Sequence, residues 1–113
     1  MISQNPQTHF VAALLDIDDF KFINDIYGHS YGDRALKSLA DSMKAFFPSD
    51  ALLGRNGGDE FCILLPNCTF AEADVQLQQF TKLSKTFSYQ GKEHAFYISL
   101  GSVSYTHLRA HET

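Results

Sequence analysis

The sequence has no excess of positive charge, few cysteines and no long apolar segment, and each absence excludes a class of protein. Nine Lys and Arg against 13 Asp and Glu give a net charge of −4, which argues against a general nucleic-acid-binding surface. Cys62 and Cys68 lack metal-binding spacing and are expected to be reduced thiols, with an oxidised pair as the alternative. No apolar run approaches the ~20 residues of a membrane span, and no signal peptide is visible. We therefore expect a cytoplasmic segment without direct membrane contact.

Apolar residues are plentiful enough for one folded domain. The chain has 113 residues, of which 44% are hydrophobic and 13% aromatic. His9–Ile17 is a nearly continuous apolar run, which predicts a central strand. Apolar residues at helical spacing then predict a short helix stopped by Gly28 and a longer amphipathic helix ended by Pro48.

The second half of the chain predicts more strands. Residues 51–55 and 60–66 are two short strands around a hairpin turn at residues 56–59. Thr69 and Glu72 have the spacing of a capping box, which predicts a helix from there to about Phe87. Residues 87–101 then read as two strands joined by a turn at Gly91. This order predicts an α/β (α+β) fold with a mainly antiparallel central sheet flanked by helices.

The last residues do not continue this pattern. Residues 102–113 lack apolar periodicity, and their back-translation resembles a common transposon-type sequencing adapter. We expect residues 1–101 to be the native part, cut short at both ends, and residues 102–113 to be a non-native tail. A genuine short tail is the alternative. His107 and His111 are therefore not interpreted as a metal-binding pair, although they stand four residues apart.

Acidic residues follow the first strand and occupy the hairpin turn. If these strands are sheet neighbours, the carboxylates of Asp16 and Asp59 converge. Two like charges about 4 Å apart repel by ~4 kcal/mol at an effective dielectric near 20. Such a site shares a proton or holds a cation, and a set of oxygen ligands favours Mg²⁺ or Mn²⁺ over zinc. The alternative is that these acids are ordinary turn and cap residues.

The residues around this acidic pair suit a nucleotide. Gly57 and Gly58 allow close backbone approach and leave main-chain N–H groups for phosphate oxygens. Lys21 opens a short helix whose N-terminus favours anions. Asn24 and Asp33 have the groups to read the edge of guanine, because Asp accepts from its N1–H and N2–H. Considered alone, Lys21 would be interpreted as a solvent-exposed helix lysine, and Asp33 as a residue at the start of a helix.

Two segments resemble the GGDEF domain of diguanylate cyclases. They are LLDIDDFKFINDIYGHSYGDRAL, residues 14–36, and GRNGGDEFCILLP, residues 54–66. Both match in order and separation, and ISLGS resembles a later strand of the family. The resemblance covers about residues 9–101. It implies a fold related to nucleotide cyclases and polymerase palm domains, and the reaction 2 GTP → cyclic di-GMP + 2 pyrophosphate.

The resemblance also implies roles for particular residues and for partners. By position, Asp16, the Ile17 carbonyl and Asp59 would bind metal, and Asp59 and Glu60 would take part in catalysis. Asn24 and Asp33 would bind guanine. Phe20 and Lys21 would contact the terminal phosphates, and Gly57 and Gly58 would line the α-phosphate path. Each domain is thought to hold one GTP, so a homodimer is needed for catalysis. An upstream sensory domain is expected in the parent protein.

Departures from the family pattern limit these expectations. The family's DxLTGLxNR segment is absent before the first strand, as is the helix after ISLG, so we expect the isolated chain to be inactive. The product-inhibition pattern RxxD aligns with residues 48–51, which lack both its Arg and its Asp. The alternatives are a catalytically silent GTP-binding regulatory module and a structural domain with exposed acids. The intact GGDEF set favours the enzyme.

Overall fold

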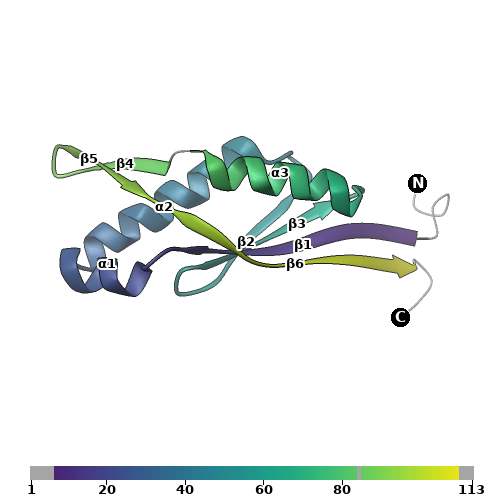
Figure 1. Cartoon of the computed structure of the whole chain (residues 1–113), viewed down its shortest axis with the longest axis horizontal. Helices are drawn as coiled ribbons and strands as arrows, with labels where there is room; N and C mark the ends of the chain where they lie inside the picture. Colours follow the sequence, from purple (N-terminus) through teal and green to yellow (C-terminus); the bar gives the residue numbers. More distant parts are fainter. Residues whose placement is uncertain (1–6, 84, 110–113) are drawn as a thin grey trace.

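A four-stranded sheet, a separate hairpin and three helices make up the part of the chain that the computed structural model describes, residues 7–83 and 85–109 (Figure 1). In chain order the elements are β1 (Gln7–Ile17), α1 (Phe20–Tyr27), α2 (His29–Phe46), β2 (Leu52–Gly57), β3 (Glu60–Pro66), α3 (Phe70–Lys82), β4 (Lys85–Tyr89), β5 (Lys92–Phe96) and β6 (Ile98–Arg109). The predicted fold class, a mixed structure with an antiparallel sheet and flanking helices, is confirmed.

The central sheet has the strand order β2-β3-β1-β6, and every pairing in it is antiparallel. β1 therefore lies between β3 and β6, which confirms that the first strand and the hairpin strand are neighbours. Asp16, near the end of β1, lies opposite Glu60 of β3 on one side and opposite Ser99 of β6 on the other. The sheet thus brings acids from two distant segments to one end of β1.

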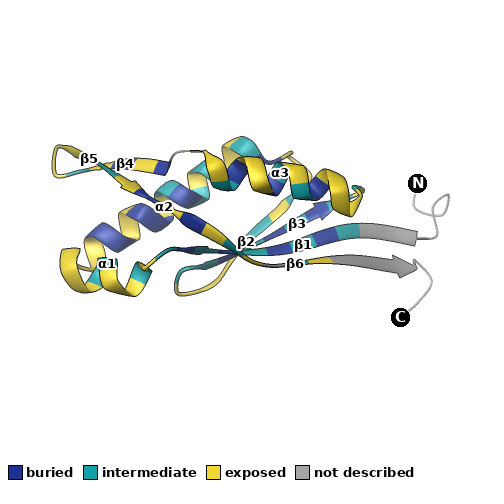
Figure 2. Cartoon of the chain, viewed as in Figure 1, coloured by how far each residue is buried: buried dark blue, intermediate teal, exposed yellow. Residues whose placement is uncertain are grey.

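One face of the sheet carries the core. Alternate residues of β1 and β3 are buried, because successive strand side chains point to opposite faces (Figure 2). α2 and α3 both lie over this face (Figure 1). The fully buried residues include Val11 and Leu15 of β1, Ile63 of β3, Leu39 of α2 and Leu77 of α3.

The other face of the sheet is less covered and carries the acids. Ala12, Leu14, Cys62 and Leu64 point to this face and are half-buried. Asp16 stands at the end of the same row, because it shares the parity of Ala12 and Leu14. The first strand therefore combines an apolar interior with a carboxylate at its rim, as the sequence indicates.

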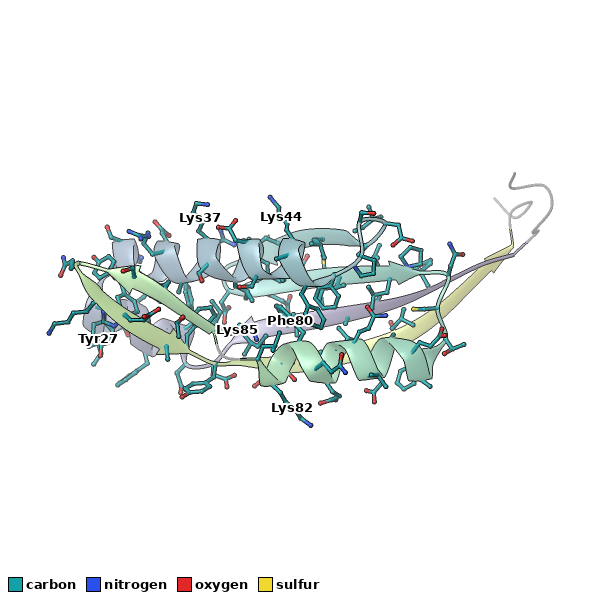
Figure 3. The ribbon with its side chains drawn as sticks, turned by 90° about the horizontal axis from the view of Figure 1, so that it is seen from above. Tyr27, Lys37, Lys44, Phe80, Lys82 and Lys85 are labelled. Atoms are coloured by element: carbon teal, nitrogen blue, oxygen red, sulfur yellow. The ribbon has the colours of Figure 1, made fainter. Side chains whose placement is uncertain are left out.

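The third helix is shorter than predicted. Its capping box is confirmed, but α3 ends at Lys82 rather than near Phe87, which lies in β4. The cause lies at Lys85, which follows the helix in extended backbone and is buried. Its ammonium donates hydrogen bonds to the carbonyls of Phe80 and Leu83, and Figure 3 shows it beside the Phe80 ring. These contacts satisfy the last helical carbonyls and fix the start of β4.

Three strands follow α3 instead of the predicted two. β4 and β5 form a separate hairpin around Gln90 and Gly91, whose φ angles of 52° and 80° suit a tight turn. After Tyr97 the chain returns to the central sheet as β6, which pairs with β1 as far as Gln7↔Arg109.

The predicted non-native tail thus includes paired backbone at residues 102–109. Pairing does not reveal the origin of a sequence, so the tail stays a prediction. The side chains of His107 and His111 lie outside the described residues.

Candidate metal and nucleotide site

Asp16 is the centre of an acidic cluster. Burial raises the pKa of its carboxyl above the ordinary 3.8, and the neighbouring charges of Asp59, Glu60 and Asp18, in that order, raise it further. Its Oδ1 atom is buried and has no hydrogen-bond partner among the residues that the structure describes. A buried acceptor without a donor is costly, and a divalent cation would supply the missing charge and contact. The donor set therefore fits Mg²⁺ or Mn²⁺.

The β2–β3 hairpin presents Asp59 to this cluster. β2 continues to Gly57, two residues beyond the predicted strand, and the turn is Gly58-Asp59. Gly57 and Gly58 have φ angles of 107° and 54°, which side chains rarely adopt, and nothing lies within 4 Å of a Cβ added at either residue. The turn therefore requires glycine for its backbone and leaves open space beside it.

Two side chains hold the hairpin in shape. Asn56 Nδ2 donates to Glu60 Oε1 at 2.8 Å, and Arg55 Nε donates to the Gly58 carbonyl at 2.8 Å. The first bond fixes the second acid of the motif, and the second bond closes the turn around its glycines. Sequence reasoning assigned no role to Arg55, although its place two residues before the first glycine was a usable signal.

The turn between β1 and α1 offers main-chain N–H groups. Asp19 has a left-handed φ of 57° and no side-chain hydrogen bond caps the helix. The first N–H groups of a helix have no intrahelical partner, so those at Phe20 and Lys21 are available to an anion. Lys21 is exposed, and Phe20 is half-buried against the core. This turn leads directly from Asp16, as the phosphate assignment requires.

The two residues assigned to guanine come from different helices. Asn24 of α1 packs against Gly32 of α2, where a Cβ atom would lie 1.8 Å from Asn24 Oδ1. That oxygen is buried and has no hydrogen-bond partner. Asp33, the next residue of α2, is exposed. The close helix contact thus brings the amide and the carboxylate near each other. Gly32, which sequence reasoning missed, allows the approach.

A groove runs from Asp33 between α2 and β2. It has a volume of about 360 Å³ and is lined by apolar residues that include Leu36, Met43 and Phe61. Asp33 and Arg55 add opposite charges to the lining. The α2 residues Lys37 and Lys44 also line it, with ammonium groups that extend outward (Figure 3). An apolar surface with polar groups at one end suits a flat base with a charged substituent.

Side chains alone do not complete a metal site here. Among the described residues, no group of three or more His, Cys, Asp or Glu side chains could hold a metal ion. The assigned ligand set has two carboxylates, Asp16 and Asp59, and needs the Ile17 carbonyl or a ligand oxygen for the rest. The structure brings the two carboxylates close enough for the charge of Asp59 to raise the pKa of Asp16.

Comparison with known proteins identifies the family of this chain. The sequence model described as "Diguanylate cyclase, GGDEF domain" matches residues 1–113. The chain belongs to the GGDEF family. It is 36% identical over 94 residues to diguanylate cyclase A of Treponema denticola, which is 81% of this chain and 25% of that protein. It is also 35% identical over 106 residues to the Bacillus subtilis protein YhcK, covering 91% and 30%.

Solved structures give the same family. A sensory box/GGDEF family protein from Caulobacter crescentus matches with a TM-score of 0.77 and 28% identity, covering 92% of this chain and 67% of that chain. Diguanylate cyclase SiaD from Pseudomonas aeruginosa, solved with its activator SiaC, matches with a TM-score of 0.72 and 33% identity, covering 93% and 40%. GGDEF structures are thus this chain's structural neighbours.

The GGDEF chain spans less than a third of these two curated relatives, 25% and 30% of their lengths. Within the described residues, no helix has both the length and the hydropathy to cross a membrane.

Proposed function

We propose that this GGDEF domain belongs to a diguanylate cyclase, which condenses two GTP into cyclic di-GMP and releases two pyrophosphates. The observation that carries the proposal is the buried, unpartnered Oδ1 of Asp16 beside Asp59 and Glu60. The charges of Asp59 and Glu60 oppose the ionisation of Asp16, and a bound proton or a cation would relieve this repulsion. The adjoining glycine turn and helix N-terminus suit the triphosphate that brings such a cation.

In this proposal, different residues of the chain bind the metal and the nucleotide. Asp16, the Ile17 carbonyl and Asp59 would hold Mg²⁺ or Mn²⁺, and Glu60 would be the second acid of the motif. A bound metal neutralises the triphosphate, makes the attacking 3′-OH more acidic and stabilises the leaving pyrophosphate. The N–H groups at Phe20 and Lys21 hold the terminal phosphates, and Gly57 and Gly58 leave a path for the α-phosphate.

Base recognition falls to Asn24 and Asp33. The Asp33 carboxylate accepts from N1–H and N2–H of guanine, groups that adenine does not present in the same pattern. The free Asn24 amide adds a contact that Gly32 lets it reach. The apolar groove beside Asp33 shields the base from water.

Ring closure requires a second copy of the domain. Each domain holds one GTP, and the 3′-OH of each nucleotide attacks the α-phosphate of the other. Catalysis is therefore mainly a matter of position and electrostatics, with two sites face to face. GTP is a cytoplasmic substrate, so the domain works in the cytoplasm, and an upstream sensory domain would control the pairing.

Turnover of GTP tests the proposal. The parent protein, with its flanking genomic sequence restored, is assayed with Mg²⁺ for cyclic di-GMP and pyrophosphate. We expect wild type and the matched control Asp74→Ala to be active and Asp59→Ala to be inactive. Equal activity of wild type and Asp59→Ala would refute the metal assignment. Mg²⁺-dependent GTP binding without product would instead identify a silent GTP-binding regulatory module.

A further inference from the structure

Ser99 of β6 contacts the turn that leads from the metal ligands to the phosphate groups. Its hydroxyl donates a hydrogen bond of 2.6 Å to Oδ1 of Asp18, 81 residues away in the sequence. Beside it, the Asp18 N–H donates to the Tyr97 carbonyl at 2.8 Å. Residues at the start of β6 therefore hold Asp18 through both its side chain and its main chain.

A β-bulge makes this contact feasible. In the pairing of β1 with β6, Leu14 lies opposite Ser102, but Leu15 lies opposite Leu100, so Gly101 is an extra residue. Without this extra residue the register would continue to Leu100 opposite Asp16. Ser99 would then lie opposite Ile17 and point into the core, because a shift of one residue reverses the face. The bulge thus places a hydroxyl on the face of the acids.

Apart from the Asp18–Tyr97 hydrogen bond and the packing of half-buried Phe20 against the core, local contacts give the β1–α1 turn little support. Asp19 adopts a left-handed backbone, α1 lacks a side-chain cap, and none of its residues is buried. The same turn carries the Ile17 carbonyl and the N–H groups of Phe20 and Lys21. A small rotation of this turn would move the carbonyl away from the cation and the N–H groups away from the phosphates.

We propose that Ser99 is a positioning residue, which fixes the β1–α1 turn through Asp18 so that its carbonyl and N–H groups meet the metal and the triphosphate together. The inference rests on the proposed function for its ligand. It adds a residue outside the GGDEF motif and a reason for the bulge at Gly101. Ser99 itself does not touch the nucleotide.

The test compares Ser99→Ala, Ser99→Thr and the control Ser88→Ala, an exposed strand serine in β4. Amide hydrogen exchange of residues 18–21 is measured in the nucleotide-free 113-residue chain. GTP affinity is measured by calorimetry with and without Mg²⁺. We expect Ser99→Ala to speed this exchange and to weaken Mg²⁺-dependent GTP binding about fivefold to tenfold, since a hydrogen bond to a charged group is lost. Ser99→Thr should keep both properties, and Ser88→Ala should change neither.

A double-mutant cycle with Asp18→Ala separates this role from general stability. The two changes should be non-additive, because either one removes the same bond. Unchanged exchange at residues 18–21 in Ser99→Ala, or additive effects, would overturn the inference. If wild type itself shows no Mg²⁺-dependent GTP binding, the proposed function fails instead, and the exchange data still decide whether Ser99 holds the turn.

Discussion

At the scale of single residues, Asp16 shows how the fold and the proposed chemistry oppose each other. The core needs the apolar residues that precede it in β1, and burial at the strand end removes water from its carboxylate. Three other acids surround it. Ionisation of Asp16 therefore carries an electrostatic cost in the folded domain, which the proposed divalent cation would relieve. The pH dependence of domain stability therefore provides a measurement of this site that does not require turnover.

The contribution of Asp16 to the stability of the metal-free domain should fall as pH rises. Because the folded pKa of Asp16 is raised above 3.8, the folded state binds its proton more tightly than the unfolded state. The resulting stabilisation is complete below about pH 3.8 and is lost as pH rises through the folded pKa. Urea unfolding followed by circular dichroism, at several pH values, measures this loss. Saturating Mg²⁺ should oppose it, so the Mg²⁺ effect should be larger near neutral pH than in acid.

Asp16→Asn is the control for this pH dependence. It should remove both the loss of stability with rising pH and the Mg²⁺ effect. A profile identical to wild type in that variant would assign the pH dependence to other groups.

Gly32 is the residue on which the predicted guanine contact depends. A Cβ atom there would lie 1.8 Å from Asn24 Oδ1 and 3.2 Å from Phe20 Cζ, so Gly32→Ala must displace both side chains. We expect it to lower GTP affinity about tenfold or more, because the amide can no longer pair with the base. Isothermal titration calorimetry measures the change.

The double variant Gly32→Ala/Asn24→Ala distinguishes recognition from folding. It should recover thermal stability, since the collision is removed and Ala favours helix, but it should not recover GTP affinity. Wild-type GTP affinity in Gly32→Ala would contradict the role of this contact.

At the scale of elements, the end of α3 depends on a buried lysine. The Lys85 ammonium lies 4.3 Å from the centre of the Phe80 ring and donates to the Leu83 carbonyl at 2.6 Å. Burial lowers the pKa of Lys85 from its usual 10.5. The unfolded state thus binds this proton more tightly than the folded state, so stability rises with pH between the folded pKa and about 10.5.

Lys85→Met should abolish this alkaline increase. Unfolding free energies of wild type and Lys85→Met are compared by urea titration from about pH 8 to pH 10.5, so that other titrating groups cancel in the difference. The loss of two hydrogen bonds at the helix end should cost about 1–3 kcal/mol near neutral pH. A constant difference at all pH values would show that burial does not lower the pKa of Lys85.

The loop between α2 and β2 gives a prediction about regulation. Residues 48–51 occupy the position of the family's RxxD pattern, and the Ala51 N–H donates to the Pro48 carbonyl at 3.0 Å. The loop lacks the guanidinium and the carboxylate of that pattern. We therefore expect no feedback inhibition by cyclic di-GMP through it. Calorimetry that finds micromolar cyclic di-GMP binding at this loop would contradict the expectation.

At the scale of the whole molecule, the central sheet was predictable and the second half of the chain was only partly so. The apolar run of β1, the stripe of α2 and the glycines of the hairpin are local signals, and each predicted element exists. The element order predicted a mainly antiparallel sheet, whereas the pairing of β1 with β3 was only a condition of the predicted acidic site, which the structure meets. The end of α3 was not predictable, because it depends on where the Lys85 ammonium finds carbonyl partners.

The candidate site was also only partly predictable from the sequence. Asp16, Asp59, Asn24 and Asp33 stand in motifs that a reader of the sequence can find. Ser99 stands in the segment ISLGS, but no local pattern indicates its contact with Asp18. That contact joins residues 81 apart and depends on the register shift at Gly101. Long-range register comes from the packing of whole strands, and no local pattern records it.

The most direct measurement of the central claim is Mn²⁺ binding with a non-hydrolysable GTP analogue, followed by electron paramagnetic resonance. Wild type is compared with Asp16→Asn, Asp59→Asn and the control Asp74→Asn on α3. If Asp16 and Asp59 share the cation, both site variants should lose Mn²⁺ affinity by about a hundredfold, and the control should keep it. Wild-type Mn²⁺ affinity in both site variants would contradict the account.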